Sequence, residues 1–145
     1  MAHWLLSTDG LAVPLVLRLT LAVVMFPHGA QKLLGWFGGH GFSRTMADFT
    51  KSGIPAPLAF LAIMAEFLGP IGLALGLLTR VAALGIGLVM LVGALTVHGK
   101  HGFFMNWYST QPGKGYEYHL LALGIALALV IGGGGAWSVD ALIAR

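Results

Sequence analysis

Residues 57–98 read PLAFLAIMAEFLGPIGLALGLL, then TR, then VAALGIGLVMLVGALTVH. Glu66 is the one charged residue of the first run, and the second run has no Asp, Glu, Lys or Arg. An α-helix needs about 20 apolar residues to cross about 30 Å of hydrocarbon. Two such runs joined by two residues predict an antiparallel pair of transmembrane helices over 57–78 and 81–98.

Two more apolar stretches flank this pair, over 11–34 and 117–135. Hydrophobic residues make up 57% of the 145 positions and charged residues 9%, whereas roughly a quarter of a soluble domain is charged. The apolar excess therefore faces lipid, where backbone polar groups need partners within the chain. We predict an all-α fold, an integral membrane four-helix transmembrane bundle that occupies 1–145 as a single domain.

Charge and cysteine content exclude several functions. The net charge of +3 comes from eight scattered Lys and Arg residues, which do not form the dense basic patch of a nucleic-acid-binding protein. The chain has no cysteine, so it cannot hold a disulfide, a zinc–thiolate site or a cysteine-ligated iron–sulfur cluster. A thiol oxidase working through its own cysteine pair is excluded as well.

The two long connections, about 35–56 and 99–117, fall on one side of the membrane if the chain crosses four times. This loop side carries more cations than the side of the termini, which predicts that the loops face the cytoplasm. The loop-side cations are Lys32, Arg44, Lys51, Lys100 and Lys114, and those of the other side are Arg18, Arg80 and Arg145.

Ionisable residues within the predicted spans need a specific reason, because burying charge in lipid is costly. Arg18, His28 and Lys32 lie within 80° of one another on a helical wheel, so we expect their stripe to face the interior of the bundle. Glu66 lies near the bilayer centre. His28 or Arg18 is its expected partner, and Lys32 could equally be an anchor reaching the interface.

A second group of polar residues gathers near the loop side. His98 and His119 lie at the ends of the third and fourth spans, and Glu117 is two residues before His119. The third loop and the start of the fourth span add the aromatic residues Phe103, Phe104, Trp107 and Tyr118.

Three ligands suit such a group. His98 and His101 have a spacing compatible with metal ligation, but loop histidines are more often ordinary hydrogen-bonding groups, and we predict no metal site. His28 with His98 or His119 could hold a haem, although no attachment motif is present. A quinone needs an apolar slot, an aromatic wall and proton donors or acceptors near its carbonyl oxygens, which these residues offer.

The order of these motifs resembles the DoxX family of small bacterial membrane proteins over nearly the whole chain. The resemblance implies a four-helix protein of the cytoplasmic membrane, of a kind associated with thiosulfate:quinone oxidoreductase and with membrane oxidoreductase complexes in oxidative-stress defence. The matching residues are Arg18, 26–33 (FPHGAQKL), Glu66, Gly69, Gly72, 76–83 (GLLTRVAA), 97–98, 102–104, 117–118 and 133–140 with Ser138 and Asp140.

We therefore predict a quinone-interacting or redox-associated subunit of a membrane oxidoreductase system, in contact with lipid and with a partner oxidoreductase subunit. His28 and Glu66 would handle protons, and Arg18 would stabilise a carboxylate or an anionic form of the quinone. The residues expected to bind the ligand are Lys32, His98, Phe103, Trp107, Glu117, Tyr118 and His119.

Two other functions stay open. A non-enzymatic scaffold would use the polar stripe only to hold helices together. A small transporter or proton pathway would use the intramembrane Glu66 with its neighbouring histidines as a relay. Glycine-lined helix faces such as Gly72 and Gly76 leave room for a homodimer.

Overall fold

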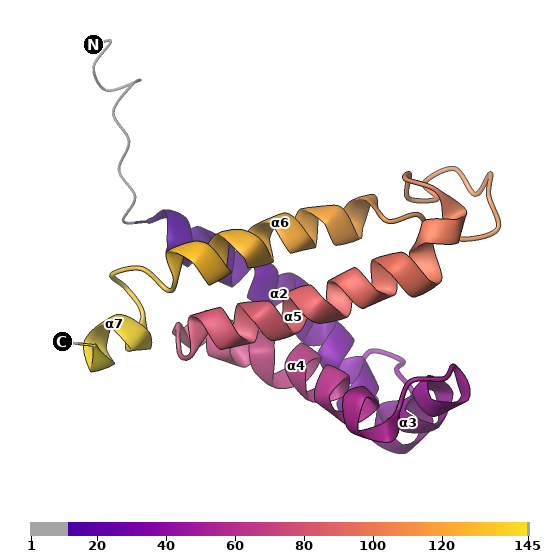
Figure 1. Ribbon diagram of the computed structural model, residues 1–145, viewed down its shortest axis with the longest axis horizontal. Helices are drawn as coiled ribbons and strands as arrows, with labels where there is room; N and C mark the ends of the chain where they lie inside the picture. The colour runs from indigo at the N-terminus through magenta and orange to yellow at the C-terminus, as the bar shows by residue number, and fades with distance from the viewer. Residues whose placement is uncertain (1–11, 145) are drawn as a thin grey trace, which may run out of the picture.

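The computed structural model describes residues 12–144, and every regular element within them is helical (Figure 1). The longer α-helices are α2 (Val13–Leu33), α4 (Ala56–Leu75), α5 (Thr79–Gly93) and α6 (Glu117–Gly132). Two short ones, α3 (Gly41–Lys51) and α7 (Val139–Ile143), add to the predicted four. Leu11, which the first predicted span includes, and Arg145 lie outside the described residues.

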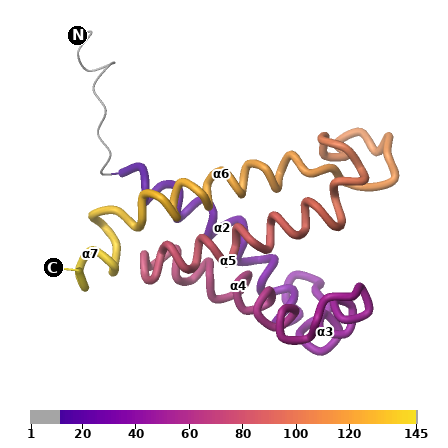
Figure 2. The backbone as a smooth tube through the Cα atoms, in the orientation of Figure 1, coloured from indigo at the N-terminus to yellow at the C-terminus, as the bar shows by residue number. Residues whose placement is uncertain are grey.

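The long helices pack in a ring, α2 on α4, α4 on α5, α5 on α6 and α6 on α2, with the two long loops at one end (Figure 2). Small side chains such as Ala83 and Ala126 alternate with larger ones such as Leu21 and Ile86, which lets the helices interdigitate. The remaining buried core residues of this cluster are Ala22, Met25, Leu73, Met90, Ala122 and Leu129.

The outer surface is as apolar as the core. Four apolar residues on these helical segments are each about 70% exposed: Val23 (71%), Leu95 (73%), Leu121 (71%) and Ile131 (69%). Three helical stretches, Val13–Leu33, Ala56–Leu75 and Thr79–His101, are long and apolar enough to cross a membrane. An apolar surface of this extent requires lipid contact, so the chain is a membrane protein.

A glycine explains the tight turn between α4 and α5. Gly76 follows the last residue of α4 with φ of 68°, a left-handed conformation that glycine adopts without strain. The N–H of Leu77 donates to the carbonyl of Gly72 at 2.8 Å, and that of Gly76 to Leu73 at 3.1 Å. This capping ends α4 at Leu75, three residues before the predicted end, and confirms the antiparallel pair.

The end of α5 departs from a regular helix. After Gly93 the chain continues through a π-helix, Ala94–His98, and a 3-10 turn, Gly99–His101, as one rod that reaches His101. The helix α6 ends at Gly132, also three residues before its predicted end, because Gly133 leaves the helical conformation with φ of 75°.

The backbones of α2 and α4 touch at Gly29. A Cβ at this position would overlap the backbone of Glu66 and Phe67, so the helices approach closely only because the residue is glycine. This contact fixes which face of α2 meets α4 and, with it, the position of every ionisable group on α2.

Candidate functional site

Lys32 and Glu66 form an ion pair between α2 and α4. The side chain of Glu66 is 2% exposed and that of Lys32 is 29% exposed, so the carboxylate is buried and the lysine side chain is partly accessible. The Lys32 ammonium also lies 5.5 Å from the ring centre of Phe49 on α3, within cation–π range. Lys32 is therefore the partner of Glu66, and the predicted His28 or Arg18 partners are wrong.

His28 is exposed on the outer surface of α2, beside Tyr118 of α6, with 6.4 Å between the ring centres. The expectation that it faces the interior with Arg18 and Lys32 is wrong. Gly29 makes the contact with α4, and one residue is 100° of helical rotation, so His28 is turned outward. Its imidazole is instead exposed on the surface of the helical bundle.

Tyr118 and His119 continue this row through α6 toward the end of α5. The ring of His119 lies 5.5 Å from that of Tyr118 and 4.2 Å from that of His98. His119 is 8% exposed, and its Nδ1 has no hydrogen-bond partner within residues 12–144. This nitrogen is an exception to the rule that buried polar groups are hydrogen-bonded.

The π-helix explains why His98 reaches His119. The wider turn over Ala94–His98 changes the direction of the side chains that follow it, and π-helical turns are frequent at functional sites. The Nδ1 of His98 lies 2.8 Å from the carbonyl oxygen of Lys114. A carbonyl can only accept, so Nδ1 carries the proton in this bond, and Nε2 is the basic nitrogen of the neutral ring.

Glu117 fixes the third loop above this row. Its Oε1 accepts hydrogen bonds from the backbone N–H of Met105 at 2.7 Å and from Nε1 of Trp107 at 2.9 Å. Phe103 packs edge-on against Tyr116, with ring centres 5.6 Å apart. The loop encloses a hollow of about 310 Å³ that Phe104, Met105, Trp107, Tyr108, Thr110 and Gln111 line.

The metal alternative fits this geometry poorly. The rings of His98 and His119 are tilted by 38° with their centres 4.2 Å apart, and no group of three or more metal-ligating side chains occurs within residues 12–144. His101 packs against Gly113, where a Cβ would lie 2.5 Å from its ring. It therefore does not converge with His98 on one metal position.

Arg18 lies at the opposite end of the bundle and is fully buried. Its guanidinium donates to the carbonyls of Leu73 at 2.9 Å, Ala74 at 3.4 Å and Trp137 at 2.7 Å. It thus caps the end of α4, where the carbonyls have no helical partner, and holds the segment after α6 against the bundle. The expected contact with Glu66 is wrong, because the guanidinium of Arg18 is held instead by backbone carbonyls at the end of α4 and after α6.

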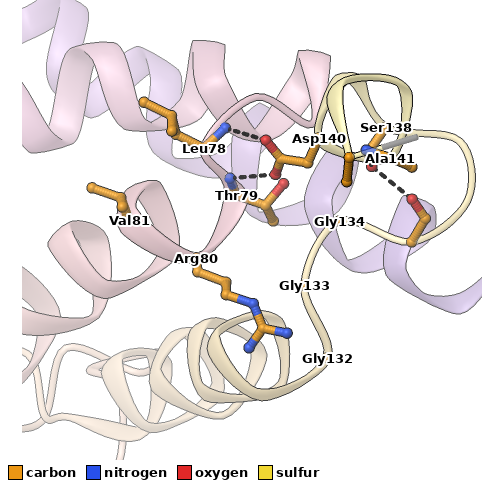
Figure 3. A pocket seen from close by; sticks show the side chains of 12 residues that line it. Leu78, Thr79, Arg80, Val81, Gly132, Gly133, Gly134, Ser138, Asp140 and Ala141 are labelled. Atoms are coloured by element: carbon orange, nitrogen blue, oxygen red, sulfur yellow. Dashed lines mark hydrogen bonds between the residues drawn. The ribbon is translucent and has the colours of Figure 1, made fainter.

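Asp140 completes this end of the molecule (Figure 3). Its carboxylate accepts from the backbone N–H groups of Leu78 at 2.7 Å and Thr79 at 2.8 Å, at the start of α5. Burial disfavours its charged form, but these hydrogen bonds and the nearby Arg18 outweigh that effect and hold the pKa of Asp140 below its usual value.

Asp140 and Arg80 were not among the predicted site residues, although both lie in the motifs of the family resemblance. The Nη1 of Arg80 donates to the carbonyls of Val130 at 2.5 Å and Ile131 at 2.9 Å, at the end of α6. The signal that could have found them is the cluster of a cation, a carboxylate and a glycine run beside predicted helix ends.

Comparison with known proteins agrees with the helical pattern. The family model described as DoxX matches residues 13–99. A protein of Bacillus subtilis (strain 168) named "Putative oxidoreductase CatD" is 29% identical over 115 residues, 79% of this chain and 76% of that protein. A Haemophilus influenzae protein named "Uncharacterized protein" is 29% identical over 134 residues, 90% of this chain and 83% of its own length. No solved structure matches at a significant level.

Proposed function

The chain belongs to the DoxX family, and from that premise we propose that it is a quinone-binding subunit of an oxidoreductase system in the bacterial cytoplasmic membrane. In this proposal α2, α4, α5 and α6 each cross the bilayer, with both long loops on the cytoplasmic side. The 16 residues of α6 extend about 24 Å, so the bilayer thins locally or residues flanking α6 complete the crossing.

The observation that carries the proposal is the outward position of His28. It lies five residues before the end of α2 at Leu33, about 8 Å inside the loop-side end. An imidazole exposed to lipid at this depth is costly unless a polar group binds it. The carbonyl oxygens of a quinone supply such a group, and a quinone reaches the site by diffusing within the lipid.

The surrounding residues support the same ligand. Tyr118 lies beside His28, so that the pair offers an aromatic ring and hydrogen-bonding atoms on one apolar surface. The unpartnered Nδ1 of His119 provides another polar atom in the same row. The Lys32–Glu66 ion pair lies on the neighbouring faces of α2 and α4 and holds the buried carboxylate of Glu66 at a fixed place.

A quinone takes up two electrons and two protons when it is reduced. In our proposal a partner oxidoreductase subunit supplies the electrons, and this chain supplies the binding surface and the protons. His28 holds a ligand oxygen, and Glu66 with Lys32 keeps an exchangeable proton close by. His119 and His98 connect this place to the loop side, where His98 meets the backbone of the third loop.

Quinone content of the purified protein tests the proposal. The wild type, His28→Ala and the matched control His40→Ala, whose imidazole is exposed outside the spans near Asp48, are purified in mild detergent. Loss of one hydrogen bond predicts about a three- to tenfold fall in extracted quinone for His28→Ala and no change for His40→Ala. A reduced-minus-oxidised spectrum of the wild type should show quinone bleaching. Equal quinone in all three proteins, or none in the wild type after loading in nanodiscs, contradicts the proposal.

A proton pathway is a second candidate function, favoured by the close His98–His119 ring pair and by the buried carboxylate of Glu66 on α4. It predicts proton flux into liposomes that Glu66→Gln and His119→Ala both remove. A scaffold would show neither the flux nor a retained quinone.

A further inference from the structure

A second cavity lies at the end of the molecule opposite the histidine row. It has a volume of about 450 Å³, within the range of small-ligand sites, and lies between the start of α5, the end of α6 and α7. Figure 3 shows Arg80 of α5 and Asp140 of α7 at this cavity, with Gly132, Gly133 and Gly134 along one wall. Gly135 also lines the cavity and completes the glycine run 132–135.

The cavity holds two opposite charges that do not pair with each other. The ion pairs within residues 12–144 are Lys32–Glu66 and His40–Asp48, so Arg80 and Asp140 share this cavity without a salt bridge between them. Opposite charges facing one cavity at a distance complement a molecule that itself carries both signs.

Arg80 keeps one edge of its guanidinium unused. Its Nη1 donates to the end of α6, whereas Nε and Nη2 make no hydrogen bond within the described residues. A Cβ added to Gly133 would lie 3.4 Å from Nη2 and 3.5 Å from Nε, so the bare glycine leaves this edge uncovered. The Nε and Nη2 edge of arginine matches two oxygens of a phosphate.

The glycine wall adds further donors. The backbone N–H groups of Gly134 and Gly135 make no backbone hydrogen bond within the described residues. Successive free N–H groups in a glycine-rich turn are a common phosphate-binding arrangement.

The opposite wall suits an ammonium group. Both carboxylate oxygens of Asp140 already accept one hydrogen bond each, from Leu78 and Thr79, and each retains a further lone pair. A primary ammonium can donate to them, whereas a quaternary ammonium has no hydrogen to donate.

The surroundings of the cavity indicate a lipid. Leu78 and Val81 line it and are 63% and 65% exposed, and Ile131 beside it is 69% exposed. Such residues at the ends of spanning helices lie where acyl chains meet headgroups. We propose that this cavity binds the phosphoethanolamine headgroup of a membrane phospholipid, with the phosphate on Arg80 and the glycine wall and the ammonium on Asp140.

Native mass spectrometry with defined lipids tests this site. Purified protein in detergent is mixed with phosphatidylethanolamine, phosphatidylcholine or phosphatidylglycerol of identical acyl chains, and with free phosphoethanolamine. We expect phosphatidylethanolamine to bind about tenfold more tightly than the other two lipids, because only it offers both a phosphate and a hydrogen-bonding ammonium. Equal binding of the three lipids overturns the proposal. Binding of free phosphoethanolamine as tight as that of phosphatidylethanolamine also overturns it, because the site would then not select a membrane lipid.

Two variants locate the site. Arg80→Gln should weaken phosphatidylethanolamine binding about tenfold, and the matched control Arg44→Gln, on α3 at the other end of the molecule, should leave it unchanged. Because Arg80 also caps α6, Arg80→Lys is included, which keeps the charge but lacks the planar edge, and it should bind with intermediate affinity. Wild-type binding by Arg80→Gln overturns the assignment. If that variant does not fold, the headgroup ranking of the wild type and the binding of Arg80→Lys decide.

Discussion

The Lys32–Glu66 pair is the ionic contact between α2 and α4, and removing its cation is the sharpest perturbation that the structure offers. Lys32→Met keeps the length and apolar stem of the side chain and removes only the ammonium. Glu66, at 2% exposure, then lies in the helical ring without a countercharge. Glu66→Gln leaves the lysine instead, whose ammonium is partly exposed and lies near Phe49.

The two substitutions should therefore differ in cost. Breaking a fully buried ion pair from one side costs about 3–5 kcal/mol. Because Lys32 is 29% exposed, we expect about 2–4 kcal/mol for Lys32→Met. For Glu66→Gln we expect about 1 kcal/mol, since the ammonium can turn toward water. The double variant should cost less than the sum of the two, because it leaves no charge without a partner.

Unfolding in mixed detergent micelles, followed by far-ultraviolet circular dichroism, measures these free energies. Lys51→Met, an exposed lysine at the end of α3, is the matched control and should lie within about 0.5 kcal/mol of the wild type. A Lys32→Met protein as stable as the control, or a double variant that loses the full sum of the single effects, would show that the pair does not act as described.

Three further outcomes follow from the same contacts. Gly29→Ala should unfold more easily than the wild type by about 2–4 kcal/mol, because its Cβ overlaps the α4 backbone, whereas Gly124→Ala, which meets open space, should cost nothing in the same assay. Asp140→Ala should lower the free energy of unfolding by about 1 kcal/mol at pH 7, because α5 loses its cap. Folding lowers the pKa of Asp140, so the stabilisation by its carboxylate is complete above the unfolded pKa of about 4 and is lost as the pH falls through the lower folded pKa. The stabilities of wild type and variant should therefore converge in acid. Glu117→Ala should shift the fluorescence of Trp107, whose Nε1 loses its acceptor, and a spectrum identical to the wild type would contradict the contact.

Much of the fold is predictable because each spanning helix corresponds to one continuous apolar run of the sequence. The charge-free run after Arg80 and the two-residue connection before it leave no alternative to an antiparallel pair, and the structure confirms this. The helix ends were misplaced by three residues where Gly76 and Gly133 take positive φ angles. Their capping depends on backbone geometry that an apolar run does not reveal.

The partners of the ionisable residues were not predictable in the same way. The rotation of α2 is set by the contact of Gly29 with α4, which turns Lys32 toward Glu66 and His28 outward. The guanidinium of Arg18 donates to the carbonyl of Trp137, which is 119 positions away in the sequence. This contact exists only because the segment after α6 folds back against the bundle. Helical periodicity gives the angles between residues on one helix but not the direction in which that helix faces.

A photoreactive quinone analogue tests whether a quinone binds beside His28. The purified protein in nanodiscs is illuminated with an azidoquinone, and the labelled peptides are identified by mass spectrometry, with and without excess unreactive quinone. Binding at this place predicts adducts on α2 around His28 and on α6 around Tyr118 that the excess quinone suppresses. Labelling confined to the end that carries Arg18 and Asp140, or labelling that the excess quinone does not reduce, would contradict it.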